Sequence, residues 1–199
     1  MDKYIESSQY IDWQTADVET LANRLSAGSE NELETAKRCF EWVRDEIKHS
    51  ADYKLDPVTC KASDVLREGT GYCYAKSHLL AALLRANGIP AGLCYQRLSV
   101  FEKGAPYCLH GLNAVYLQKQ GWYRMDARGN KHGVDAQFNP PYEKLAFQIV
   151  DENEADLPEI FSEPLPNVVA VLEKYLTFSE VLANLPDVDA HLLIGRRKH

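Results

Sequence analysis

The chain has 199 residues, of which 45% are hydrophobic and 26% charged. This composition is typical of a globular protein, and the length suffices for a sizeable core without disulfides or metals. The formal net charge of −7 argues against sequence-independent binding to nucleic acid. Five cysteines without framework spacing, and an acidic N-terminus without an apolar signal region, favour a cytoplasmic location. No apolar run reaches the length of a transmembrane helix.

Helical spacing dominates the first part of the chain. A weak pattern predicts a helix over 17–26. A stronger pattern predicts a helix over 30–48, preceded by a capping box formed by Ser29 and Glu32. The polar segment 49–60 indicates a loop.

A third helix begins at Cys73. Apolar residues follow on more than one face of this helix, so we expect it to be largely buried. Gly88 and Pro90 end it. A cysteine in the first turn lies near free N–H groups and the positive end of the helix dipole, and both favour a thiolate.

After Pro90 the spacing changes from helical to alternating. Segments 92–101, 109–117 and 122–127 alternate and are rich in β-forming residues, which predicts three strands. The loop between the last two is of hairpin size. A further strand is predicted over 145–150, where it would help to complete the sheet.

The order of these elements predicts an α+β fold. Helices come first, antiparallel strands follow, and segment 166–185 again shows helical spacing. We expect residues 1–199 to form a single domain with a core over about 30–150. The remainder, 151–199, is expected to be a helical extension that affects access to the site.

A nucleophilic thiol needs a base beside it and a group that orients this base. His110 opens the second predicted strand, and Asp126 closes the third. In an antiparallel pair, each residue of the second predicted strand lies opposite one residue of the third. The side chains of His110 and Asp126 share a face of the sheet if the numbers of such opposite residues have an even sum, which requires an odd-length loop or a bulge. In that register Asp126 can hold one ring nitrogen of His110 while the other faces Cys73.

Three stretches resemble motifs of the transglutaminase-like superfamily. "ASDVLREGTGYCYAKSHLLAALLRANGIPAG" resembles its cysteine helix, and "HGLNAVYL" and "GWYRMD" resemble its histidine and aspartate strands. The resemblance covers roughly 39–130. It implies a papain-like fold, in which a helix bearing Cys73 packs on an antiparallel sheet that carries His110 and Asp126. Members of the superfamily include protein-crosslinking transglutaminases, cysteine proteases, peptide N-glycanases and scaffolds without activity.

Three features depart from the pattern of this family. Tyr72 stands where an acid or a small polar residue often precedes the cysteine. Leu112 stands where tryptophan commonly follows the histidine by two residues, and Ala-Arg-Gly-Asn replaces a proline-threonine turn after Asp126. None of these changes removes a triad group, but each alters the groove beside it. The candidates for substrate binding are Gly71, Tyr72 and Trp122.

We therefore expect Cys73, His110 and Asp126 to form a catalytic triad that hydrolyses an amide or peptide bond through a thioester, as a protease or amidase does. Two alternatives stay open: acyl transfer to an amine, as in a transglutaminase, and a non-catalytic module that binds peptides or proteins. The expected partner is a peptide or protein substrate, or a small amide, with no nucleic acid and no membrane. The sequence implies no metal and no organic cofactor.

Other cysteines and histidines are weaker candidates. Cys108 and His110 form a Cys-x-His pair, but no second pair has the spacing of a zinc site. His78 lies on the wrong side of its helix to serve the nucleophile. His132 and Asp135 offer an alternative base pair if the strand register excludes His110. The expected packing thiols are Cys39, Cys60 and Cys94.

Overall fold

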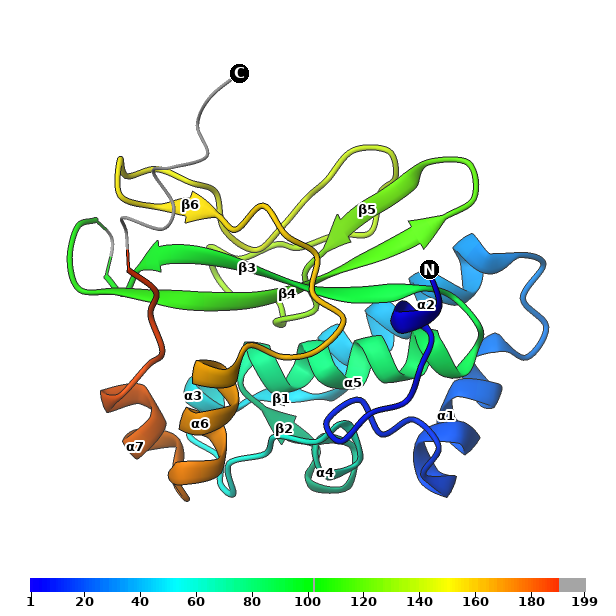
Figure 1. The fold of residues 1–199 in the computed structure, drawn as a ribbon, viewed down its shortest axis with the longest axis horizontal. Coiled ribbons are helices and arrows are strands. Elements are labelled where there is room, and N and C mark those ends of the chain that lie inside the picture. The colour runs from blue at the N-terminus through cyan, green and yellow to red at the C-terminus, as the bar shows by residue number, and fades with distance from the viewer. Residues whose placement is uncertain (102, 190–199) are drawn as a thin grey trace.

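A four-stranded antiparallel sheet spans the molecule, with most of the helices below it in Figure 1. The computed structural model describes residues 1–101 and 103–189. The strands are β3 (Ala91–Ser99), β4 (Tyr107–Leu117), β5 (Gly121–Met125) and β6 (Ala155–Asp156), and their order in the sheet is β5-β4-β3-β6. The α+β class predicted from the sequence is confirmed.

Helix α5 (Cys73–Ala86) lies at the centre, directly beneath the sheet (Figure 1). Thirteen of its fourteen residues are buried, as the apolar pattern predicts. Helices α1 (Ala16–Ser26), α2 (Glu32–Glu46) and α4 (Ala62–Glu68) contact it. The C-terminal helices α6 (Pro166–Lys174) and α7 (Phe178–Ala183) lie toward the end of the molecule where α5 begins (Figure 1). Within the described ranges, no helix combines the length and apolar composition needed to cross a membrane.

Short elements lie before and between these helices. They are a 3-10 helix (Asp2–Tyr4), strand β1 (Lys48–His49), helix α3 (Ser50–Tyr53) and strand β2 (Thr70–Gly71). Strands β1 and β2 pair in parallel, with His49 opposite Gly71. The chain that leads into α5 is therefore anchored to the segment that leaves α2.

The two faces of the sheet carry separate clusters. On the face toward α5, Gly111 approaches the helix so closely that a Cβ atom there would lie 3.0 Å from the Cα of Tyr74. The other face carries Cys94, Leu112 and Ala114, covered by Trp122, Leu145 and Ile160. His110 alternates with Gly111 along β4, so the two residues project to opposite sides of this strand.

The register of the β4–β5 hairpin is the one the candidate triad requires. Asn113 pairs with Met125 and Leu117 with Gly121, so paired residue numbers have an even sum. The loop between the strands has three residues, 118–120, which is the odd length expected for this register. His110 and Asp126 consequently lie on the same face of the hairpin.

Segment 145–150 does not form the predicted strand. The N–H of Ala146 donates to Oδ2 of Asp126 at 3.1 Å, and that of Val150 donates to Oε2 of Glu154 at 2.8 Å. Carboxylate side chains thus bind backbone donors that a neighbouring strand would otherwise have paired. The fourth strand of the sheet is instead β6, which pairs with β3.

Two further predictions, for the N-cap of α2 and for segment 49–60, are also wrong. The N-cap is Asn31, which accepts the N–H of Glu34, and the Glu34 carboxylate accepts the N–H of Glu30. The reciprocal capping therefore lies two residues beyond the predicted pair Ser29–Glu32. The segment 49–60, expected to be a loop, contains helix α3.

Candidate active site

Cys73 is the first residue of α5 and is 7% exposed. Strand β2 ends two residues earlier at Gly71, where an added Cβ would lie 3.1 Å from Oγ1 of Thr59 and 3.2 Å from Cβ of Ala75. Gly71 therefore lets β2 pack tightly against the start of α5. It does not line the cavity beside Cys73, where the sequence suggested a role in admitting substrate.

His110 and Asp126 form a buried hydrogen-bonded pair. Nε2 of His110 lies 2.7 Å from Oδ2 of Asp126, and the two residues are 5% and 1% exposed. The carboxylate also accepts the N–H groups of Arg128 and Ala146, each at 3.1 Å. These bonds fix its orientation. Nδ1 of His110 is then the nitrogen available to Cys73, which lines the same cavity and whose side chain helps to raise the pKa of the ring.

The pair is charged at neutral pH. Burial lowers the pKa of His110, but the charges of Asp126 and Cys73 outweigh burial and raise this pKa to about 10. Burial likewise raises the pKa of Asp126, but the charge of His110 and three hydrogen bonds outweigh it and hold the pKa below its usual value. The site therefore places an imidazolium beside the Cys73 sulfur.

Gly111 supplies a further contact to the sulfur. Its backbone N–H donates a hydrogen bond to Sγ of Cys73 at 3.4 Å. This approach requires glycine, because a Cβ would meet the Tyr74 backbone at 3.0 to 3.1 Å. Gly111 was not among the residues predicted from the sequence. The available signal was a glycine inside a predicted strand directly after His110, since such a glycine often marks close backbone approach.

The other cysteines have different surroundings. Cys39 and Cys60 belong to the main hydrophobic core and Cys94 to the cluster on the opposite face of the sheet, as predicted for packing thiols. Burial raises the pKa of each of these thiols, and that of Cys108, to about 12. Among the described residues, no group of three or more histidine, cysteine, aspartate or glutamate side chains is placed to hold a metal ion.

A cavity of about 880 Å³ opens beside Cys73 and His110. Tyr72 lines it, as the sequence analysis suggested, but Trp122 does not. The ring of Trp122 packs edge-on against Tyr4 at 4.8 Å, within the cluster that covers the far face of the sheet. The structure therefore brings one of the three proposed substrate-binding residues to the cavity.

Tyr72 connects the candidate site to the C-terminal helices. Its hydroxyl donates to the backbone carbonyl of Phe178, the first residue of α7, at 2.6 Å. Its ring lies 5.5 Å from that of His49 and 6.5 Å from that of Tyr74. A bulky residue before the cysteine thus serves to attach α7.

The cavity wall also contains a charged group that was not predicted from the sequence. Arg128 donates two hydrogen bonds to Asp52, at 2.6 and 3.1 Å, and Lys131 donates a third at 2.7 Å. Burial raises the pKa of Asp52, but these cations outweigh it and lower the pKa to about 2. Burial, and then the charge of Arg128, lowers the pKa of His49, whose Nδ1 lies 3.7 Å from Asp52.

The aromatic ring of Phe147 contacts both this charged group and His110. The guanidinium of Arg128 lies 5.4 Å from the ring centre of Phe147. Phe147 in turn meets the ring of His110 edge-on at 5.0 Å. Phe147 therefore separates the imidazole from the cation and covers one side of it.

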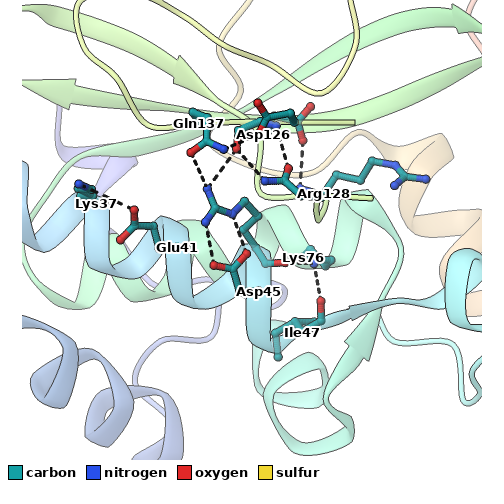
Figure 2. A network of polar contacts seen from close by, with 12 residues as sticks. Lys37, Glu41, Asp45, Ile47, Lys76, Asp126, Arg128 and Gln137 are labelled. Atoms are coloured by element: carbon teal, nitrogen blue, oxygen red, sulfur yellow. Dashed lines mark hydrogen bonds and ion pairs between the residues drawn. The ribbon is translucent and has the colours of Figure 1, made fainter. Parts of the chain in front are cut away.

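A second polar network joins α2 to α5 and to the segment that contains Ala136 and Gln137 (Figure 2). Arg44 of α2 donates to the Ala136 carbonyl at 3.1 Å and to Oε1 of Gln137 at 3.3 Å. Lys76 of α5 is fully buried and donates to the backbone carbonyls of Arg44 and Ile47. Burial, and then the charge of Arg128, lowers the pKa of Lys76 to about 7.

The remaining histidine candidates lie elsewhere. Nδ1 of His78 is 2.7 Å from the Cys60 carbonyl, and burial lowers the pKa of His78 to about 4. His132 is exposed, and its proposed partner Asp135 pairs with Lys144 instead. Since the register brings His110 to Asp126, neither of these groups replaces His110 beside the cysteine.

Comparison with known proteins places the chain in a family. The model of the transglutaminase-like superfamily matches residues 19–127, more than half of the chain. No curated protein sequence matches this chain.

Two solved structures are similar. A candidate cysteine protease from Cytophaga hutchinsonii has 22% sequence identity, a TM-score of 0.51 and an alignment that covers 63% of this chain and 40% of that one. The periplasmic domain of TgpA from Pseudomonas aeruginosa has 19% identity and a TM-score of 0.48, with 62% and 45% covered. The chain thus spans less than half the length of these two proteins, and likeness to the first shows a shared fold. By its family match, the chain belongs to the transglutaminase-like superfamily.

Proposed function

We propose that the chain is a cysteine hydrolase that cleaves amide or peptide bonds. In this proposal Cys73 is the nucleophile, His110 is the acid and base, and Asp126 orients His110. The observation that carries the proposal is the buried pair of His110 and Asp126, 2.7 Å apart, beside the sulfur at the start of α5. The open cavity next to these groups supplies room for a substrate.

The first half-reaction forms a thioester. The Cys73 sulfur attacks the carbonyl carbon of the amide, and the carbonyl oxygen becomes an oxyanion. The N–H of Cys73 lies in the first turn of α5, has no acceptor within the helix, and can donate to this oxyanion. His110 gives its proton to the nitrogen of the leaving amine as the carbon–nitrogen bond breaks.

The second half-reaction hydrolyses the thioester. His110, now neutral, takes a proton from a water molecule, which attacks the thioester carbon. The carbon–sulfur bond breaks, the acid is released, and the Cys73 thiolate and His110 imidazolium return. Asp126 keeps its negative charge throughout and stabilises the imidazolium.

Water is the acceptor in this proposal because it is far more abundant than any amine. A transferase would need to bind an amine and to exclude water from the thioester. Hydrolysis is therefore the simpler outcome of the same acylation step.

A library of peptide amides, incubated with and without a labelled amine, tests the proposal. We expect products that end in a carboxylic acid from the unaltered chain and from Cys60→Ala, which removes a thiol outside the cavity. We expect none from Cys73→Ala. An equal amount of acid product from Cys73→Ala would contradict the proposal. Incorporation of the labelled amine into the product would show that the chain catalyses amine transfer and not hydrolysis.

A further inference from the structure

Part of the cavity wall next to Cys73 is apolar. The end of β3 and the residues just after it contribute Leu98 and Phe101, and the segment after Lys144 contributes Val150. Helix α7 contributes Leu182, and Leu185 follows it. We propose that this wall binds a bulky aliphatic or aromatic side chain of a peptide substrate, close to the amide that reacts. The inference rests on the proposed hydrolase function and names its substrate class.

The exposure of these side chains supports a ligand surface. Phe101 is 71% exposed, Val150 64% and Leu182 48%. Single exposed apolar residues are ordinary on protein surfaces. Here three of them come from separate segments and line one concave site that already holds a candidate nucleophile. Such convergence is characteristic of binding pockets.

One buried carboxylate fixes two parts of this wall. Glu154 is 3% exposed and accepts the N–H groups of Ser99 at 2.9 Å, Val150 at 2.8 Å and Asp151 at 3.1 Å. The end of β3 and the segment that bears Val150 are therefore held together before any substrate arrives. A preformed wall loses little conformational entropy on binding.

The third part of the wall, α7, is fixed at both of its ends. At its start, the Phe178 carbonyl accepts the hydroxyl of Tyr72. After its end, the Pro186 carbonyl accepts the N–H of Leu109 at 2.7 Å, and Asp187 accepts two hydrogen bonds from Arg97, both at 2.8 Å. Leu182 and Leu185 thus face the cavity from a firmly attached segment.

The polar part of the wall carries little net charge. It includes three acids, Asp52, Asp135 and Glu154, and three cations, Arg128, Lys144 and the protonated ring of His110. Glu154 is bound by backbone N–H groups, and the other five form ion pairs with one another or with a neighbour. Selection by substrate charge should therefore be weak, and the apolar wall should dominate discrimination between side chains.

Binding to Cys73→Ala separates recognition from chemistry. The probes are fluorescein-labelled Gly-Gly-Leu-Gly-Gly amide and its counterpart with serine in place of leucine, followed by fluorescence polarisation. We expect the leucine peptide to bind about 10- to 100-fold more tightly, which is the usual discrimination by an apolar pocket. In this background Leu182→Asp and Val150→Asp should abolish the preference. Leu176→Asp, which alters a 77% exposed residue outside the cavity, should retain it.

The outcomes for this inference and for the hydrolase differ. Equal affinity for the two peptides, or no binding of either, would overturn the apolar site even if the unaltered chain hydrolyses amides. Loss of the preference in Leu176→Asp would overturn it as well. A preference for leucine without hydrolysis by the unaltered chain supports the apolar site and contradicts only the proposed chemistry.

Discussion

The hydroxyl of Tyr72 donates a 2.6 Å hydrogen bond to the backbone carbonyl of Phe178. This bond joins the residue before Cys73 to the first residue of α7, although the two lie 106 positions apart in the chain. One of the positions where the sequence departs from the family pattern, Tyr72, is therefore a structural attachment. It connects the start of the cysteine helix to a helix that lines the cavity.

Tyr72→Phe should destabilise the chain by about 1 kcal/mol, because the Phe178 carbonyl loses its donor. Urea unfolding measures this change, and hydrogen exchange should show faster opening of α7. Tyr142→Phe is the matched control, since Tyr142 is 74% exposed. Equal losses of stability in the two variants would show that the bond to Phe178 contributes nothing.

Asp126→Asn should lower the pKa of His110. The negative charge that raises this pKa to about 10 is removed, while burial, which lowers it, remains. NMR titration of the His110 ring measures the effect. We expect the ring to stay protonated through pH 8 in the unaltered chain. In the variant, the pKa of the ring should lie below about 6.5. Titration near pH 6.5 in the unaltered chain would contradict the charged pair.

Lys76→Met should change how stability depends on pH. The folded chain releases the Lys76 proton near pH 7, whereas the unfolded chain keeps it to about pH 10.4. The unfolded state therefore binds more protons in this window, and the Lys76 contribution to stability rises with pH.

Urea unfolding at pH 7.5, 8.5 and 9.5 measures this contribution as a difference. The unaltered chain should gain stability over Lys76→Met by up to about 1.4 kcal/mol per pH unit. Groups common to both chains cancel in the comparison. A constant difference across the three pH values would show that Lys76 keeps an ordinary pKa when folded.

Gly111→Ala should destabilise the chain by about 1 to 3 kcal/mol, because the added methyl group meets the Tyr74 backbone at 3.0 Å. Relief of this clash moves β4 away from α5 and withdraws the N–H that contacts Cys73. The midpoint temperature of thermal unfolding and the rate of Cys73 alkylation should both decrease. If the midpoint temperature and the alkylation rate are both unchanged, β4 need not lie so close to α5.

Local patterns predicted much of the fold and of the candidate site. The helix that starts at Cys73 follows from apolar spacing and from Gly88, and the three long strands follow from alternation. The sequence predicted that His110 and Asp126 share a face only if paired residue numbers have an even sum, which an odd-length loop produces. The β4–β5 hairpin meets this condition. These features depend on residues close together in sequence.

Features that depend on distant contacts could not be predicted. Segment 145–150 has the composition of a strand, but Asp126 and Glu154 bind two of its backbone donors. The pair of Asp52 and Arg128 joins residues 76 positions apart, and no local pattern indicates it. Tyr72 was a visible departure from the family, but its partner lies in α7.

The most direct test of the central claim is the rate at which iodoacetamide alkylates Cys73 at pH 7, followed by peptide mass spectrometry. Cys108 lines the same cavity, and burial raises its pKa to about 12, so it serves as an internal reference. We predict that Cys73 reacts at least about tenfold faster than Cys108, and that His110→Ala slows Cys73 by about tenfold or more because the imidazolium that stabilises the thiolate is lost. Alkylation of Cys73 at the rate of Cys108, or a rate unchanged by His110→Ala, would contradict the account.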